Sequence, residues 1–212
     1  MRPDQFIADL EGLDFSNTFN PYCHCCPIYD LPEAATIRRA CLLDMLKAAL
    51  QTGVDSMWLG RDLGYRGGRR TGLALTDDIH VTSHAYRWQI TIERATKGPP
   101  IAERTAAVIW KGLAQIKSPV FLWNVFPLHP HDFDNPFSNR CHNSRERDAG
   151  ESILAELIDI LRPKRLIAIG NDAMKAAKRV SGVSDIIQVR HPSYGGQTIF
   201  LNQIENLYRV SE

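Results

Sequence analysis

Apolar residues recur every three or four positions in several stretches of the chain, which is the spacing of an amphipathic helix. The first stretch runs from Glu33 to Gln51, with Pro32 before it and Gly53 after it as start and stop signals. The same spacing predicts further helices over residues 99–116, 151–162 and 171–180, and a closing helix over residues 197–210.

Short, continuously apolar segments follow these helices and are typical of buried strands. They cover residues 56–60, 119–124, 165–170 and 186–190. Helices that alternate with such strands indicate an α/β fold with a parallel sheet. At 212 residues the chain fits a single domain over residues 1–212. Residues 1–32, rich in Pro, Cys and aromatics, are expected to form an irregular segment packed on that domain.

Polar side chains stand directly after each predicted strand. Ligands bind beyond the carboxyl ends of the strands in an open parallel sheet, so we expect these side chains to meet at one rim. They are Arg61 and Asp62, Asn124, Asn171 and Asp172, and His191. An acid, an amide and a histidine at one rim predict a functional site.

Three of these residues suggest a chemical role, and each also has a structural alternative. Asp62 would act as a general base or face a developing cation, or else it caps a turn. A neutral His191 would donate a hydrogen bond to an oxyanion, or else it is bonded in the core. Asn124 would complement an imide edge such as that of uracil, or else it satisfies a local turn.

The segment over residues 60–72, "GRDLGYRGGRRTG", is rich in glycine and arginine. It lacks the Gly-Lys-Ser/Thr of a P-loop and the spacing of G-x-G-x-x-G, so no nucleotide cofactor is expected. Arg66, Arg69 and Arg70 are instead predicted to contact a sugar-phosphate backbone. The alternative is a solvated charged loop that Asp77 and Asp78 partly balance.

Composition and charge narrow the class of protein. With 44% hydrophobic and 23% charged residues, the chain is typical of soluble globular proteins. The net charge of +1 means that any nucleic-acid surface must be local. No apolar run approaches the roughly 20 residues of a membrane span, and the N-terminal residues lack the apolar core of a signal peptide. We therefore expect a cytoplasmic protein without a membrane partner.

The five cysteines are expected to be reduced thiols or metal ligands rather than a disulfide framework. Cys23 and Cys26 in "CHCC" supply two ligands, whereas a closed zinc or iron–sulfur site needs four. Cys141 and His142 form the other Cys/His pair, and thiols are the preferred interpretation. The polar segment 129–147 around this pair is predicted to be a surface loop, with DNA contact or metal binding as the weaker alternatives.

Together these residues resemble the uracil-DNA glycosylase superfamily. Its first motif is a strand followed by G-x-x-P-G or G-Q-D-P-Y, and the corresponding segment here, residues 60–64, reads "GRDLG". Its H-P-S motif is matched by residues 191–193, and its strand-terminal asparagine by Asn124. The stretch "GYRGGRRTGLALTDD" is also similar to "GYRGxRxTGxPFTSE" of some bacterial members. The resemblance runs from Trp58 to the C-terminus.

The resemblance implies a three-layer α/β/α sandwich with a four-stranded parallel sheet. It also implies hydrolysis of the N-glycosidic bond of uracil in DNA, on a nucleotide extruded from the base stack, without a required metal. Asp62 matches the acid that orients water and stabilises the oxocarbenium-like sugar. His191 matches the histidine that stabilises the uracil anion through O2, and Asn124 matches the amide that reads the base.

Further residues follow from the same match. Arg61, Leu63, Gly64 and Leu75 are expected to line the uracil site. Gly64 stands where G-Q-D-P-Y enzymes carry a tyrosine that excludes thymine, so exclusion of thymine would require Tyr65 or another side chain to fill that space. Leu75 replaces the aromatic residue that stacks on uracil in related chains.

The last motif is expected to contact DNA. Ser193 and Tyr194 are the predicted contacts, and Tyr194 is the candidate wedge in place of a leucine. Iron–sulfur members carry two later cysteines, but Pro127, Leu128 and the residues near Ala149 stand at those positions, so no cluster is expected.

The predicted protein is a monomeric, monofunctional glycosylase acting on single- or double-stranded DNA that contains uracil. No lysine falls within the motifs to form a Schiff base with the sugar. The alternatives are a catalytically inactive DNA- or nucleotide-binding protein on the same fold, and a metal-binding regulator built on the cysteine cluster.

Overall fold

A four-stranded sheet forms the centre of the molecule. The computed structural model describes residues 2–180, 182–183 and 185–209. The strands β2 (Ser56–Asp62), β3 (Val120–Phe126), β5 (Arg165–Ile169) and β6 (Ile186–Val189) are all parallel and lie in the order β3-β2-β5-β6. Each lies at the position that its apolar run predicts, and the parallel α/β fold is confirmed.

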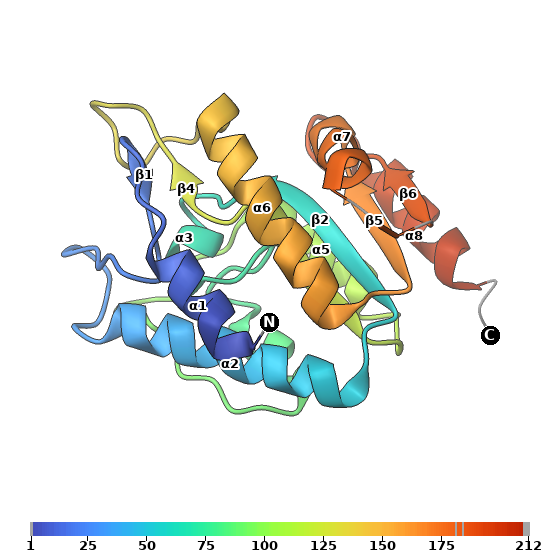
Figure 1. The fold of residues 1–212 in the computed structure, drawn as a ribbon, viewed down its shortest axis with the longest axis horizontal. Coiled ribbons are helices and arrows are strands. Elements are labelled where there is room, and N and C mark those ends of the chain that lie inside the picture. The colour runs from blue at the N-terminus through green and yellow to red at the C-terminus, as the bar shows by residue number, and fades with distance from the viewer. Residues whose placement is uncertain (1, 181, 184, 210–212) are drawn as a thin grey trace.

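Helices cover both faces of this sheet, as Figure 1 shows. On one face, α1 (Pro3–Glu11), α2 (Ala34–Thr52), α6 (Ser144–Leu161) and α7 (Asn171–Val180) share one apolar core with Met57 and Leu59 of β2. On the other face, α5 (Arg104–Leu113) and α8 (Gln197–Arg209) pack on Trp58. Successive strand side chains point to opposite faces, so the continuous apolar run of β2 fills both cores. The result is the expected three-layer α/β/α sandwich.

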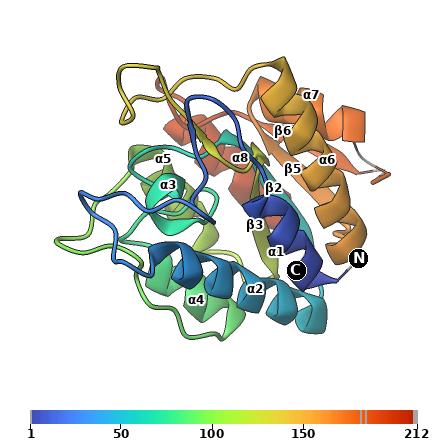
Figure 2. The ribbon, with the colours of Figure 1, turned by 60° about the vertical axis from the view of Figure 1, so that its left-hand side comes forward.

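The N-terminal segment is more regular than the sequence analysis predicted. Residues 3–11 form α1, whose Phe6 and Leu10 are fully buried in the core, with Phe6 5.6 Å from Trp123 between ring centroids. Farther along, β1 (Thr18–Phe19) pairs antiparallel with β4 (His129–Pro130), which brings residues near 20 alongside the loop after β4 (Figure 2). The prediction of an irregular segment is therefore wrong for these residues, because their apolar side chains bury against the sheet layer.

Several element boundaries also differ from the predictions. Helix α5 begins at Arg104, not at residue 99, because the Pro99–Pro100 pair keeps the preceding backbone non-helical. Helix α6 begins seven residues earlier than predicted, since Asn143 and Glu146 form a capping box. Two short helices, α3 (Gly68–Thr71) and α4 (Val81–Trp88), were not predicted. Residue 210 of the predicted closing helix lies outside the described residues. Within the described ranges, no helix is long and apolar enough to cross a membrane.

Candidate active site

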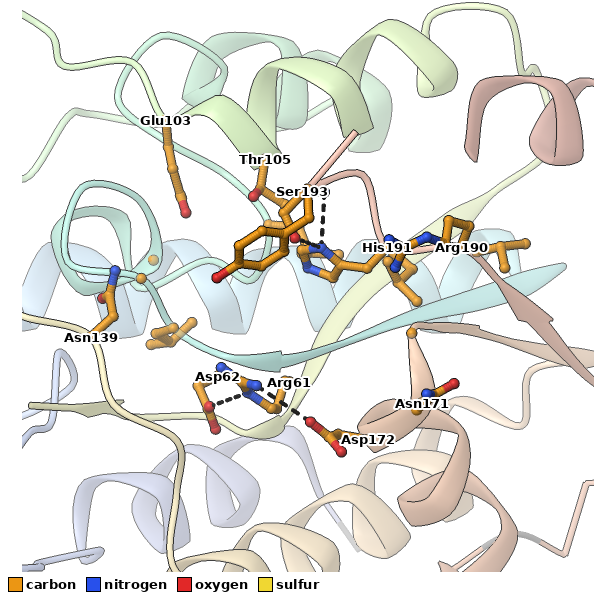
Figure 3. Close-up of a pocket in the computed structure, with 18 of the residues that line it drawn as sticks. Arg61, Asp62, Glu103, Thr105, Asn139, Asn171, Asp172, Arg190, His191 and Ser193 are labelled. Carbon is orange, nitrogen blue, oxygen red and sulfur yellow. Dashed lines mark hydrogen bonds and ion pairs between the residues drawn. The ribbon is translucent and has the colours of Figure 1, made fainter. Parts of the chain in front are cut away.

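A cavity of about 460 Å³ opens at the carboxyl edge of the sheet (Figure 3). The ends of β2, β5 and β6 reach it, as the strand-end argument predicts. Its volume lies in the range of small-molecule sites. Among the residues that line it are eight of the predicted site residues: Arg61, Asp62, Leu63, Gly64, Leu75, His191, Ser193 and Tyr194.

Asp62, the last residue of β2, is held on both of its carboxylate oxygens. Its side chain is 7% exposed. One oxygen accepts a hydrogen bond from Arg61 Nε at 2.8 Å, and the other accepts one from Nδ1 of His142. Arg61 also contacts Asp172 at the start of α7, with 3.3 Å between Nη1 and Oδ2. Two donors from different segments thus fix the orientation of the acid at the cavity.

His191 is a neutral donor at the same cavity. The backbone N–H of Ser193 donates to its Nδ1 at 3.1 Å, and the Ser193 hydroxyl lies 2.7 Å from the same nitrogen. An Nδ1 that accepts must be unprotonated, so the proton of the neutral ring is on Nε2. Burial lowers the pKa of His191, and the nearby charges of Arg61 and Arg190 lower it further. Nε2–H has no hydrogen-bond partner among the described residues and remains available to a ligand.

The turn that carries His191 depends on unusual backbone conformations. Tyr194 has a φ of 51° and Gly195 a φ of 76°, both in the left-handed region. A Cβ on Gly196 would lie 2.1 Å from the carbonyl oxygen of His191. This tight turn leaves the Tyr194 side chain 96% exposed at the rim of the cavity.

Asn124 lies behind the cavity rather than in its wall. It stands opposite Gly60 in the register of β2 and β3 and is 1% exposed. Both polar atoms of its amide are buried without a hydrogen-bond partner among the described residues. A Cβ on Gly60 would lie 2.3 Å from Asn124 Oδ1 and 2.9 Å from Leu75 Cδ2, so the amide lies close to the cavity residue Leu75. An unpaired buried amide is costly, and such a group beside a cavity is one that a ligand can complete.

A model of the uracil DNA glycosylase superfamily matches residues 53–203. The chain belongs to this superfamily. As a member of this superfamily, the protein is a DNA glycosylase, which is a hydrolase of N-glycosyl bonds. The chain is also similar to the crystal structure of wild-type SMUG2 from Pedobacter heparinus, with a TM-score of 0.59 and 13% identity over 99% of this chain and 97% of the other. A search of curated protein sequences finds no significant match.

Two of the arginines that were predicted to contact phosphate are buried inside this glycosylase. Arg69 is 4% exposed and donates to the Tyr29 hydroxyl at 2.7 Å and to the Pro136 carbonyl at 2.9 Å. Arg70 is 3% exposed and pairs with Asp78, with 2.7 Å between Nε and Oδ2. The prediction that these two side chains contact DNA is corrected, because their guanidinium groups are buried and bonded within the protein. They join α3 to the N-terminal segment and to the loops around it.

Arg66 remains on the surface. Its Nε donates to the hydroxyl of Tyr65 at 2.7 Å, and its guanidinium lies 5.4 Å from the centroid of that ring. The backbone N–H of Tyr65 in turn donates to Asn139, a cavity residue. Arg66 therefore stays available for the predicted phosphate contact near the site.

The segment after β4 supplies site residues that the sequence analysis missed. Asn139 and Arg140 line the cavity, and His142 bonds Asp62. Arg140 is anchored by Glu146, with 2.6 Å between Nη2 and Oε1. The prediction of a plain surface loop is therefore incomplete. The Asn143–Glu146 capping pattern is the sequence signal that could have placed His142 at a helix start.

Glu103 and Thr105, at the start of α5, also line the cavity. Figure 3 shows the Glu103 side chain extending into the same opening that Asn139 faces. Burial and the neighbouring Asp77 carboxylate raise the pKa of Glu103 to about 7. Neither residue follows a strand, so the positions of the strand ends could not predict that they belong to the site.

None of the described cysteines lines the cavity, although Cys141 stands between the cavity residue Arg140 and His142. All five are free thiols; Cys23, Cys25 and Cys141 are exposed, and the other two are buried. In the part of the chain that the structure describes, no three His, Cys, Asp or Glu side chains are grouped so that they could hold a metal ion.

Proposed function

We propose that this glycosylase removes uracil from DNA by hydrolysing its N-glycosidic bond and leaves an abasic site. The observation that carries the proposal is the pairing of a carboxylate, Asp62, with a neutral N–H donor, His191, in one cavity. Departure of an anionic base leaves a cationic sugar, and each fragment needs a group of complementary charge.

The proposed mechanism divides the work between these residues. Asp62 orients water and stabilises the positive charge that develops on the sugar. Nε2–H of His191 donates to O2 of the departing base, where the negative charge grows. The unpaired amide of Asn124 accepts from N3–H and donates to the neighbouring carbonyl, so bound uracil satisfies its buried polar atoms.

The cavity can take a uracil only when the nucleotide is rotated out of the base stack, and base flipping is part of the proposal. Exposed Tyr194 at the rim is the candidate that fills the space left in the stack. Arg66 and Arg190, both exposed, are candidates for the flanking phosphates. The proposed enzyme is a monomer that acts on single- or double-stranded DNA without a metal. No described lysine lines the cavity, which supports a monofunctional enzyme.

The test is release of uracil from a labelled oligonucleotide, read as strand cleavage after alkali, with single- and double-stranded substrates. Asp62→Asn should slow excision by roughly 10²–10⁴-fold, and His191→Ala by roughly 10²-fold. Asp44→Asn, an exposed acid on α2, is the matched control and should cut like wild type. A wild-type protein that binds the DNA but leaves uracil in place would point to an inactive DNA-binding member of the superfamily.

A further inference from the structure

Glu103 occupies space that two glycines leave open, Gly64 in the cavity wall and Gly67 next to it. A Cβ on Gly64 would lie 2.7 Å from its Oε1, and a Cβ on Gly67 would lie 1.9 Å from its Oε2. The glycine turn after β2 thus makes room for a carboxyl group that reaches over from α5. The backbone N–H of Glu103 donates to Asp77 Oδ2 at 2.6 Å, which anchors the residue at this point.

The carboxyl group of Glu103 has no partner of its own. Among the described residues it makes no hydrogen bond and no ion pair. The neighbouring Asp77 is fully buried and carries a charge of the same sign, and its other carboxylate oxygen lies 2.6 Å from Nδ1 of His80. The other charged or titratable groups that line the cavity are Arg61, Asp62, Arg140, Asp172, Arg190, His191 and Tyr194, and none of them pairs with Glu103.

An ionised carboxylate at this position would oppose the departure of an anionic base. A protonated carboxyl group would instead offer an O–H donor to that base. Burial and Asp77 favour the protonated form near neutral pH, in agreement with this need. A half-buried carboxyl group that holds its proton up to about pH 7 can therefore serve as a hydrogen-bond donor in a site that stabilises an anion.

We propose that Glu103 is a base-contacting residue that acts in its protonated form and donates a hydrogen bond to a carbonyl oxygen of the departing base. The proposal rests on the proposed function in that it requires a base that leaves as an anion. It extends to the class of bases that carry a carbonyl group, of which uracil is one. The proton stays on Glu103 throughout, so no proton transfer is involved.

The first test is the pH dependence of excision under single-turnover conditions. The wild-type rate should fall as the pH rises through about 7 and approach a tenfold loss per pH unit above it, since the donor is lost on ionisation. Glu103→Gln, which keeps an N–H donor at every pH, should lose this falling limb and remain within a few-fold of wild type at pH 6. Glu103→Leu, without a donor, should be roughly 10²-fold slower at pH 6. Glu33→Gln, an exposed glutamate, is the control for the charge change.

The second test does not require catalysis. Calorimetry in two buffers of different ionisation enthalpy measures proton uptake when the protein binds a duplex that contains a non-cleavable 2′-fluoro deoxyuridine. At pH 7.5 wild type should take up more protons than Glu103→Gln. Equal uptake by the two proteins, or a falling limb that persists in Glu103→Gln, would overturn the proposal for Glu103. If the uptake difference is present but wild type releases no uracil, only the proposed function fails.

Discussion

Replacement of Glu103 by glutamine should stabilise the folded protein at alkaline pH. The perturbed quantity is the pKa of this carboxyl group, which rises from 4.5 to about 7 on folding. Burial is the larger cause and the Asp77 charge adds to it. The difference corresponds to about 3 kcal/mol of unfolding free energy. Glutamine fills nearly the same volume without a charge, so it removes this cost.

The pH range of the effect follows from where the proton is held. Below pH 4.5 the folded and unfolded chains both hold it, so wild type and Glu103→Gln differ little there. Between 4.5 and about 7 only the folded chain holds the proton, and the stability of wild type falls as the pH rises. Above about 7 both states are ionised and the full cost remains.

The assay is urea unfolding of both proteins at several pH values between 5 and 8.5, followed by tryptophan fluorescence. The advantage of Glu103→Gln should grow across this range to about 3 kcal/mol. Glu33→Gln, with its side chain in solvent, should show no such growth. An advantage that is the same at every pH would refute the reasoning, because it would mean that the carboxyl group ionises equally in both states.

Three further predictions concern the site and the arginines. His142→Phe removes the hydrogen bond to Asp62 and should slow single-turnover excision by roughly 10²-fold with little change in DNA affinity; an unchanged rate would show that the contact does not position the acid. Arg70→Met leaves Asp78 buried without its cation and should lower the unfolding free energy by about 3–5 kcal/mol. The double variant Arg70→Met with Asp78→Leu should regain most of the lost unfolding free energy in the same urea assay. Arg66→Ala should reduce the slope of log affinity against log salt by about one, and a slope equal to that of wild type would place Arg66 in solvent rather than on a phosphate.

The sheet was predictable because its strands are buried on both faces and therefore read as continuous apolar runs. The same logic placed Asp62 and His191 together, since the carboxyl ends of parallel strands share one edge. Burial of arginine was not predictable in this way. The partners of Arg69 are Tyr29 and Pro136, which are distant in sequence. The local sequence around an arginine next to glycines is the same whether its side chain is exposed or buried.

The missed site residues have a common physical origin. His142 and Glu103 both precede helices and come from outside the sheet, His142 to bond Asp62 and Glu103 to line the cavity, so no strand end marks them. Their positions depend on how far α5 and α6 extend, and the sequence analysis placed the start of each helix incorrectly. For α6 the error was avoidable, because Asn143 and Glu146 have the spacing of a capping box.

Two carboxyl groups in one cavity have opposite surroundings, and these surroundings match the roles that we propose for them. Both oxygens of Asp62 accept hydrogen bonds, from Arg61 and from His142, and these two donors hold it in place for its proposed role facing a sugar cation. Glu103 accepts none and lies beside another acid, which favours a neutral group that can face a departing anion. Exchanging the two charge states would place each group against a fragment of its own sign. The chemistry of this site therefore depends on the partners that the fold supplies to each carboxyl group, and residue type alone does not distinguish the two.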